Sequence, residues 1–176
     1  MKNVNLKNKF LKSKNVNEHK VTFLFDHTNN WIREYINPET FVNSKKYNFS
    51  FTENYKEIKN QTIVFILSYT KILKKDFLKS NDLNLVIHAS KLPKGKGFSP
   101  VQWQILDGLN NIPITLIEAN EKVDSGAVLI SDNFKLNGYE LYDEIREKQA
   151  KATIKIIKNF LNIFPNYSKT CQKGKE

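Results

Sequence analysis

The sequence lacks the features that mark several large classes of protein. It has a single cysteine, Cys171, which excludes an intramolecular disulfide framework and is typical of a reducing compartment. No apolar run approaches the roughly 18 residues of a membrane span, and the N-terminal stretch has no apolar core of a secretory signal. The 3 histidines are scattered and offer no metal-ligand spacing. These absences predict a cytoplasmic protein with no metal site and no membrane partner.

Two common phosphate-binding motifs are missing as well. The turn after the first apolar run reads FDHTNN, not G-x-G-x-x-G, and no G-x-x-x-x-G-K-[ST] occurs, which disfavours NAD and ATP chemistry. The net charge of +10 admits an anionic partner, because clustered cations attract anions over a long range. The lysines are dispersed among asparagines, however, and form no stripe. We therefore expect no nucleic-acid partner.

Apolar runs of strand length alternate with helical patterns along most of the 176 residues. Strands are expected at 20–25, 47–51, 62–68, 83–88, 112–119 and 127–136, and helices at 31–36, 74–80, 99–108 and within 138–164. The helix at 99–108 is the best marked, with Ser99 as its cap, Pro100 in its first turn and Gly108 at its end. The alternation predicts an α/β fold with three layers and a mainly parallel central sheet. We expect one domain over 20–165, between an N-terminal tail (1–19) and a C-terminal tail (166–176).

Ligands of parallel sheets bind beyond the carboxyl ends of the strands. Three predicted strands end there in polar residues: Asp26 with His27, Ser68 with Tyr69, and His88 with Ser90. Of these, His88 combined with Asp124 in a later glycine-containing loop suits acyl transfer, because a carboxylate orients the imidazole and the ring donates to an oxyanion. A strand-end histidine is more often structural than catalytic, so position alone leaves both interpretations open.

The stretch HASKLPKGKGFSP, followed by KVDSGAVL, resembles the formyltransferases that use 10-formyltetrahydrofolate. That family shares the pattern Asn-x-His-x-Ser-x-x-Pro and a later Asp-x-Gly. His88, Ser90 and Pro93 match the first element, and Asp124 and Gly126 match the second. The resemblance covers about 20–164 and implies a Rossmann-like formyltransferase fold, 10-formyltetrahydrofolate as cosubstrate, and His88 and Asp124 as the catalytic pair.

The resemblance also implies binding residues. For the folate these are Leu67, Ser68, Tyr69, Ile72, Glu118, Ala119 and Asp124. For the acceptor they are Ser90, Lys94, Gly95, Lys96, Gly97 and Trp103. The loop LPKGKGFSPVQWQIL is similar to sugar-nucleotide N-formyltransferases of the pseudaminic acid type. It implies that the acceptor is the primary amine of a nucleotide-linked sugar, most simply a UDP-linked amino-dideoxy sugar. The resemblance to the family as a whole allows a homodimer.

Several alternatives stay open at this point. Lys94 and Lys96 are equally explained as solvated side chains, and a tryptophan at the position of Trp103 is more often a core residue. The family's asparagine falls at Val86, and the family usually continues beyond a segment like the C-terminal CQKGKE. A truncated or non-catalytic module that binds folate or a nucleotide is therefore the second hypothesis. A methionyl-tRNA or glycinamide ribonucleotide formyltransferase is the third, and the first of these needs a tRNA-binding domain for which the sequence has no room.

Overall fold

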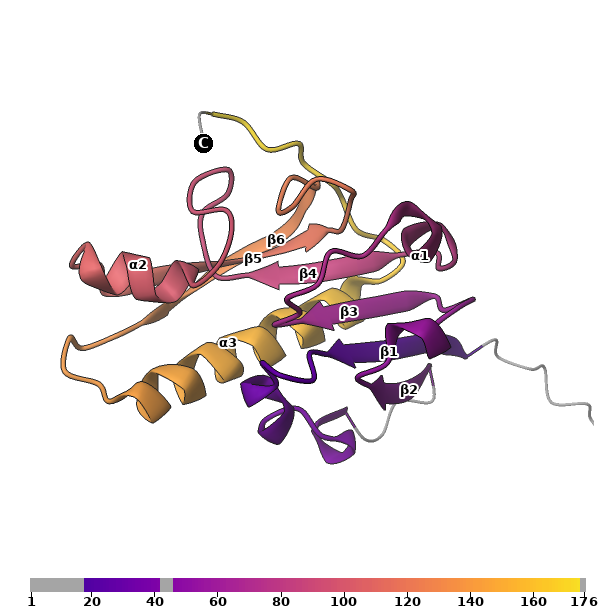
Figure 1. Cartoon of the computed structure of the whole chain (residues 1–176), viewed down its shortest axis with the longest axis horizontal. Coiled ribbons are helices and arrows are strands. Elements are labelled where there is room, and N and C mark those ends of the chain that lie inside the picture. Colours follow the sequence, from indigo (N-terminus) through magenta and orange to yellow (C-terminus); the bar gives the residue numbers. More distant parts are fainter. Residues whose placement is uncertain (1–17, 42–45, 175–176) are drawn as a thin grey trace, which may run out of the picture.

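A six-stranded sheet organises the described part of the chain (Figure 1). The computed structural model describes residues 18–41 and 46–174; most of the expected N-terminal tail (1–19) lies outside them. The strands are β1 (His19–Phe25), β2 (Tyr47–Thr52), β3 (Ile63–Leu67), β4 (Asn84–His88), β5 (Asn111–Glu118) and β6 (Val128–Lys135). Their order is β2-β1-β3-β4-β5-β6; the first four pair in parallel, whereas β5 and β6 are antiparallel to their neighbours. The predicted α/β class with a mainly parallel sheet is confirmed.

The helical segments are mostly short. They are the 3-10 turns η1 (Trp31–Glu34), η2 (Pro38–Phe41) and η3 (Tyr55–Glu57) and the α-helices α1 (Lys75–Lys79), α2 (Pro100–Leu106) and α3 (Tyr142–Ile163). The α-helix expected at 31–36 is therefore wrong: only one 3-10 turn forms, because Pro38 disfavours helical backbone at the residue before it. Within the described residues, no helix is both long and apolar enough to cross a membrane.

The start of α2 also differs from expectation. Pro100 is its first residue, as predicted, and Gly108 follows its end at φ +76°. Ser99 precedes the helix with a left-handed backbone (φ 55°), and its side chain makes no capping hydrogen bond. The predicted serine cap is wrong, because a cap requires extended backbone that points the hydroxyl at the first free N–H groups.

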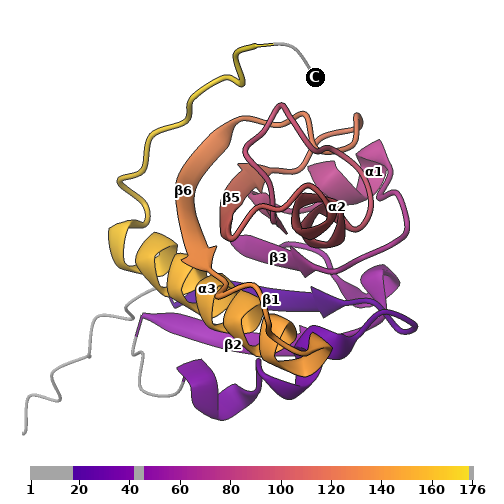
Figure 2. The ribbon, with the colours of Figure 1, turned by 90° about the vertical axis from the view of Figure 1, so that its left-hand side faces the viewer.

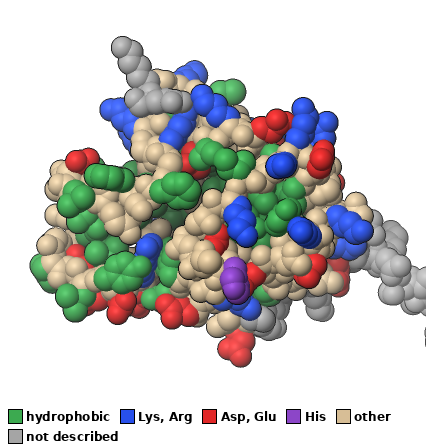
Figure 3. All heavy atoms as spheres, viewed as in Figure 1, with side chains coloured by type: hydrophobic (Ala, Val, Ile, Leu, Met, Phe, Trp, Pro, Cys, Tyr) green, Lys and Arg blue, Asp and Glu red, His purple; other side chains and the backbone are tan. Residues whose placement is uncertain are grey.

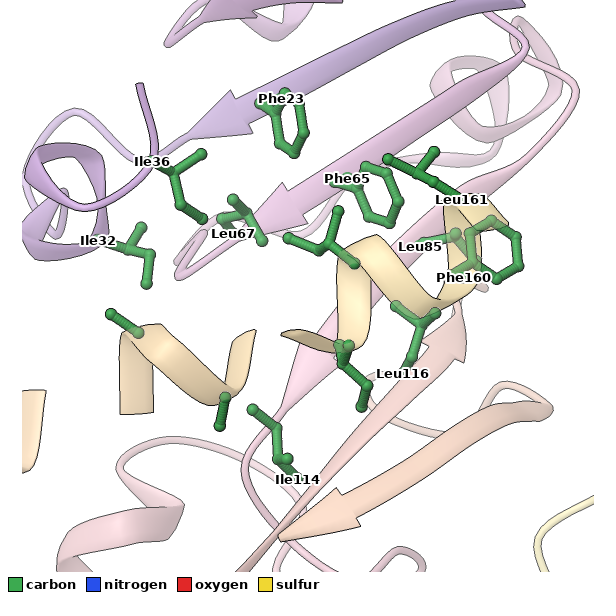
Figure 4. Close-up of a cluster of buried hydrophobic side chains, with 14 of the residues drawn as sticks. Phe23, Ile32, Ile36, Phe65, Leu67, Leu85, Ile114, Leu116, Phe160 and Leu161 are labelled. Atoms are coloured by element: carbon green, nitrogen blue, oxygen red, sulfur yellow. The ribbon is translucent and has the colours of Figure 1, made fainter. Parts of the chain in front are cut away.

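The sheet is covered on both faces, which makes three layers. On one face, α3 packs Phe160 edge-on against Phe65 of β3, with ring centroids 6.1 Å apart. Figure 4 shows Phe160 and Leu161 of α3 beside side chains of this face of the sheet. On the other face, Val64 and neighbouring apolar residues pack against α1. Figure 2 shows α1 and α3 on opposite sides of the sheet.

The strand order places a crevice at one edge of this sheet. β1 lies between β2 and β3, so the chain passes from β1 outwards to β2 and then back across β1 to β3. In open sheets of this kind, the connections after the parallel strands diverge at the reversal and leave a ligand-binding crevice at the carboxyl ends. The loops that follow β1, β3 and β4 all begin at that edge.

Candidate active site

A cavity of about 520 Å³ opens at the carboxyl ends of β3 and β4. Side chains alternate across a strand, so Val86 and His88 of β4 face the α1 side and Ile87 faces the α3 side. All three line the cavity, which therefore extends around the edge of the sheet and receives residues from both faces. Figure 3 shows hydrophobic side chains around a hollow on this side of the molecule.

His88 and Asp124 meet at this cavity. His88 is 7% exposed, and Nδ1 of its imidazole lies 3.6 Å from Oδ2 of Asp124. Its Nε2 donates a hydrogen bond to the Gly95 carbonyl at 2.6 Å, and Oδ2 of Asp124 accepts one from the Gly97 N–H at 2.9 Å. The glycine loop after β4 thus contacts both side chains. An acyl oxygen that takes the Nε2 proton has to replace the Gly95 carbonyl.

The loop that carries Asp124 is held in a tight backbone conformation. Asp124 has a positive φ of 49°, which aspartate tolerates better than most residues. Two residues later, a Cβ on Gly126 would lie 1.6 Å from the carbonyl oxygen of Glu118, so only glycine fits this approach. Glu118 is tied in turn by its carboxylate to Lys169 at 2.7 Å, and this contact raises the pKa of the lysine.

A segment after α3 returns to this loop and fastens it. Thr170 exchanges two backbone hydrogen bonds of 2.8 Å with Val128, at the start of β6. The side-chain amide of Gln172 donates to the carbonyls of Asp124 at 2.8 Å and of Gly126 at 2.9 Å. The segment expected as a C-terminal tail (166–176) therefore supports the loop that carries Asp124. Its described part, 166–174, is called the strap below.

The buried carboxylate of Asp26 holds two loops in place beside the cavity. Asp26, directly after β1, is 2% exposed and accepts hydrogen bonds from the N–H and hydroxyl of Thr28 and of Thr70. Burial opposes its ionisation, but the bonds from Thr70 and Thr28 outweigh it and hold the pKa of Asp26 well below its usual range. Burial, and then the charge of Asp26, raises the pKa of Tyr69. Asp26 therefore ties the loops after β1 and β3 together.

A family model described as Formyl transferase matches residues 5–161. The chain belongs to the formyl transferase family. The match covers the sheet, the cavity and both members of the His88 and Asp124 pair.

Individual relatives show the same family. Methionyl-tRNA formyltransferase of Caldicellulosiruptor saccharolyticus is 32% identical over 125 residues, which are 68% of this chain and 40% of the relative. Among solved structures, methionyl-tRNA formyltransferase from Clostridium thermocellum matches 89% of this chain and 70% of its own with a TM-score of 0.75 at 21% identity. The chain thus spans less than half the length of the first relative.

A sugar enzyme is similar in fold alone. PseJ of Anoxybacillus kamchatkensis, solved with UDP-4,6-dideoxy-4-formamido-L-AltNAc and tetrahydrofolate, has a TM-score of 0.58 at 16% identity, over 89% of this chain and 82% of that one. The likeness to the pseudaminic acid type that the glycine loop implied has no sequence support from these relatives and stays a prediction.

Most of the residues that the formyltransferase resemblance assigns to folate line the cavity. Those that do are Ser68, Tyr69, Ile72, Glu118, Ala119 and Asp124. Leu67 does not line it: it is 2% exposed and belongs to the core beneath α3. The neighbours of Leu67 reach the cavity because the chain leaves the sheet directly after it.

Fewer of the residues assigned to the acceptor than of those assigned to the folate line the cavity. Gly97 lines the cavity, whereas Lys94, Gly95 and Lys96 lie in the loop outside the set of lining residues. Ser90 is 2% exposed, and its hydroxyl has no hydrogen-bond partner in the described part of the chain. It lies under Gly95, where an added Cβ would be 3.0 Å from the Ser90 Cβ.

Trp103 is not a core residue. Its exposed fraction is 64%, so the core interpretation is wrong, and it does not line the cavity either. The helix α2 instead buries Val101, which is 2% exposed. With only 7 residues, α2 is too short for its hydrophobic periodicity to predict which face is buried.

Val86 stands where the formyltransferase resemblance expects an asparagine. Val86 lines the cavity two residues before His88 and offers no side-chain hydrogen bond. Asn84 cannot replace it, because its amide donates to the Leu78 carbonyl at 2.8 Å and its oxygen accepts from Asn81 at 3.3 Å. These bonds brace α1 against β4 and leave His88 as the side-chain donor of this strand at the cavity.

Arg146 and Gln149 also reach the cavity, from the first turns of α3, and no sequence pattern predicts them as site residues. Trp31 and Asn29, after β1, line the same part of it. No motif marked them, because they come from distant segments that only the fold brings together. In the part of the chain described by the structure, no group of three His, Cys, Asp or Glu residues could hold a metal ion.

Proposed function

We propose that this chain transfers a formyl group from 10-formyltetrahydrofolate to a primary amine. The observation that carries the proposal is the convergence of His88 and Asp124, 3.6 Å apart, on a cavity at the carboxyl edge of the sheet of a formyl transferase. The two residues are far apart in the sequence and lie on different elements. Their meeting at the one edge where such sheets bind ligands supports a catalytic role over a structural one.

The chemistry follows from the two side chains. The unprotonated amine attacks the formyl carbon, a tetrahedral oxyanion forms, and the carbon–N10 bond breaks to release tetrahydrofolate. His88 donates a hydrogen bond from Nε2 to the oxyanion in place of the Gly95 carbonyl. Asp124, beside Nδ1, holds the ring, accepts the proton that the attacking nitrogen loses, and passes it to N10 as tetrahydrofolate leaves. Removal of one such donor typically lowers turnover by about 10² to 10³.

The cavity suits a flat, partly apolar donor. Ile66, Val86 and Ile117 supply an apolar wall on the α1 side of the sheet. The backbone after β3, at 68–73, and after β5, at 118–121, borders the same space. N–H and C=O groups of such segments can form hydrogen bonds with the polar edge of a pterin. Ligand pockets commonly combine an apolar lining with a few polar groups of this kind.

The identity of the acceptor determines which formyltransferase reaction the chain catalyses, and two candidate acceptors have specific support. Methionyl-tRNA is supported by the relatives that carry that name, at 32% identity in the first case. A nucleotide-linked amino sugar is supported by the glycine loop at 92–106 and by the fold shared with PseJ. A binding module without turnover is supported by Val86 and by the bond that occupies Nε2 of His88.

The test is the release of tetrahydrofolate by the purified chain, followed by absorbance. The donor is 10-formyltetrahydrofolate, and the acceptors are methionyl-tRNA, glycinamide ribonucleotide and UDP- and dTDP-linked amino sugars. Release that requires one acceptor establishes the reaction and identifies its substrate. Folate binding without release for every acceptor contradicts formyl transfer and establishes the binding module.

A further inference from the structure

Formyl transfer as described above gives no role to Arg146, which lines the cavity from α3. Its side chain is half-buried and is held by neutral groups. Nε donates to the Tyr142 hydroxyl at 2.9 Å, and Nη1 donates to the Gln149 side-chain oxygen at 3.2 Å. The guanidinium carbon lies 4.3 Å from the centroid of the Trp31 ring. These contacts fix the plane of the guanidinium and leave three of its five N–H groups for a ligand.

The charges around the cavity are unevenly compensated. Each carboxylate that lines it has a basic partner: Glu118 with Lys169 at 2.7 Å, Glu121 with Lys75 at 3.4 Å and Asp124 with His88 at 3.6 Å. Lys71 and Arg146 line the same cavity, and neither pairs with a carboxylate among residues 18–41 and 46–174. Two uncompensated positive charges in one cavity favour a ligand that carries more than one negative charge.

The position of Arg146 favours a contact with the acceptor over a contact with the folate donor. The apolar wall proposed for the pterin lies on the α1 side of the sheet, together with Val86 and His88. Arg146 belongs to α3, on the other side, where Trp31 and Gln149 accompany it. An amine that reaches the formyl carbon at His88 from this side extends the rest of its molecule towards Arg146.

We infer that Arg146, held by Trp31 and Gln149, binds a phosphate group of the amine-bearing acceptor. The inference rests on the proposed formyl transfer for the identity of the ligand as the acceptor. A guanidinium fork offers paired donors that match two oxygens of a phosphate, and such charge-assisted pairs are stronger than neutral hydrogen bonds. The phosphate can belong to a nucleotide-linked small molecule or to the end of an RNA, and the chemistry at Arg146 is the same in both.

The test is calorimetric titration of the full chain with UDP and, separately, with a short RNA that ends in CCA. We expect one of these probes to bind the wild type and to bind Arg146→Gln about 10- to 100-fold more weakly, because charged hydrogen bonds are lost. Arg146→Lys, which keeps the charge without the fork, is expected to bind with intermediate affinity. The probe that responds identifies the source of the phosphate.

Arg33→Gln is the matched control. Arg33 also lies over an aromatic ring, 5.0 Å from the centroid of Phe25, and donates to the Ile36 carbonyl, but it does not line the cavity. Its replacement removes the same charge and is expected to leave the affinity for the probe within about twofold of the wild type. Melting curves of each variant exclude loss of fold as the cause.

Tetrahydrofolate is titrated into the same proteins. Binding of tetrahydrofolate that weakens in Arg146→Gln, with unchanged binding of UDP and RNA, assigns Arg146 to the folate and overturns the inference. Absence of UDP and RNA binding to the wild type overturns it as well. If the wild type binds no tetrahydrofolate, the proposed formyl transfer fails, whereas a phosphate site at Arg146 is still detected by its own probes.

Discussion

The strap after α3 gives a prediction whose magnitude follows from two hydrogen bonds. Gln172 donates to the carbonyls of Asp124 and Gly126, and each neutral bond of this kind contributes about 1 kcal/mol to stability. Gln172→Glu keeps the shape of the side chain but replaces the donor with a carboxylate that repels both carbonyls. It is expected to cost about 2 kcal/mol or more, which corresponds to a fall in Tm of roughly 4 to 8 °C for a domain of this size.

The same substitution is expected to lower turnover, because the backbone that carries Asp124 loses its support. We expect a fall of about tenfold, the equivalent of about 1.4 kcal/mol in the barrier. The assays are thermal unfolding and the rate of tetrahydrofolate release, with the exposed neighbour Lys173→Ala as control. A Gln172→Glu protein with the Tm and turnover of the wild type would refute the reasoning that the strap positions the carboxylate.

Three further predictions concern the walls of the site. Gly126→Ala is expected to abolish stable folding of the loop, because its Cβ would collide with the Glu118 carbonyl; loss of the cooperative melting transition at the wild-type temperature checks this. Since the folded-state pKa of Asp26 is depressed, its stabilisation is present above about pH 4 and is lost as the pH falls towards the folded value, so urea unfolding of Asp26→Asn should vary less between about pH 6 and pH 3 than that of the wild type. Lys169→Gln removes a partly exposed ion pair and should cost less than about 1 kcal/mol by the same measurement.

The sheet could be predicted from the sequence because its strands are apolar runs with clear ends. The stretches at 20–25, 62–68 and 83–88 each became a strand within one or two residues of the expected bounds. Pairing direction was harder to predict. β5 pairs antiparallel with β4 after the connection at 89–110, which is long enough for a parallel crossover as well, so its length did not predict the direction.

The candidate site was predictable only where a motif marks it. His88, Ser90, Asp124 and Gly126 belong to a spaced pattern, and the structure brings the histidine and the aspartate together. Arg146 gave no such signal, because an arginine on an amphipathic helix is normally a solvated side chain and only the tertiary fold turns it into a cavity.

Gln172 illustrates a third case. Its segment resembles the place where the formyltransferase family continues, but its partners here are the backbone carbonyls of Asp124 and Gly126. Backbone groups are common to every residue, so no residue type in the sequence identifies them as partners. Such contacts become visible only when the path of the chain after α3 is known.

The most direct test of the central claim separates turnover from binding at His88. We would measure the rate of tetrahydrofolate release with a productive acceptor and the affinity for tetrahydrofolate, for the wild type and for His88→Ala. If Nε2 stabilises the oxyanion, release should fall at least about 100-fold while the affinity changes little. Unchanged release, or a loss confined to the affinity, would contradict the assignment of His88 and Asp124 to formyl transfer.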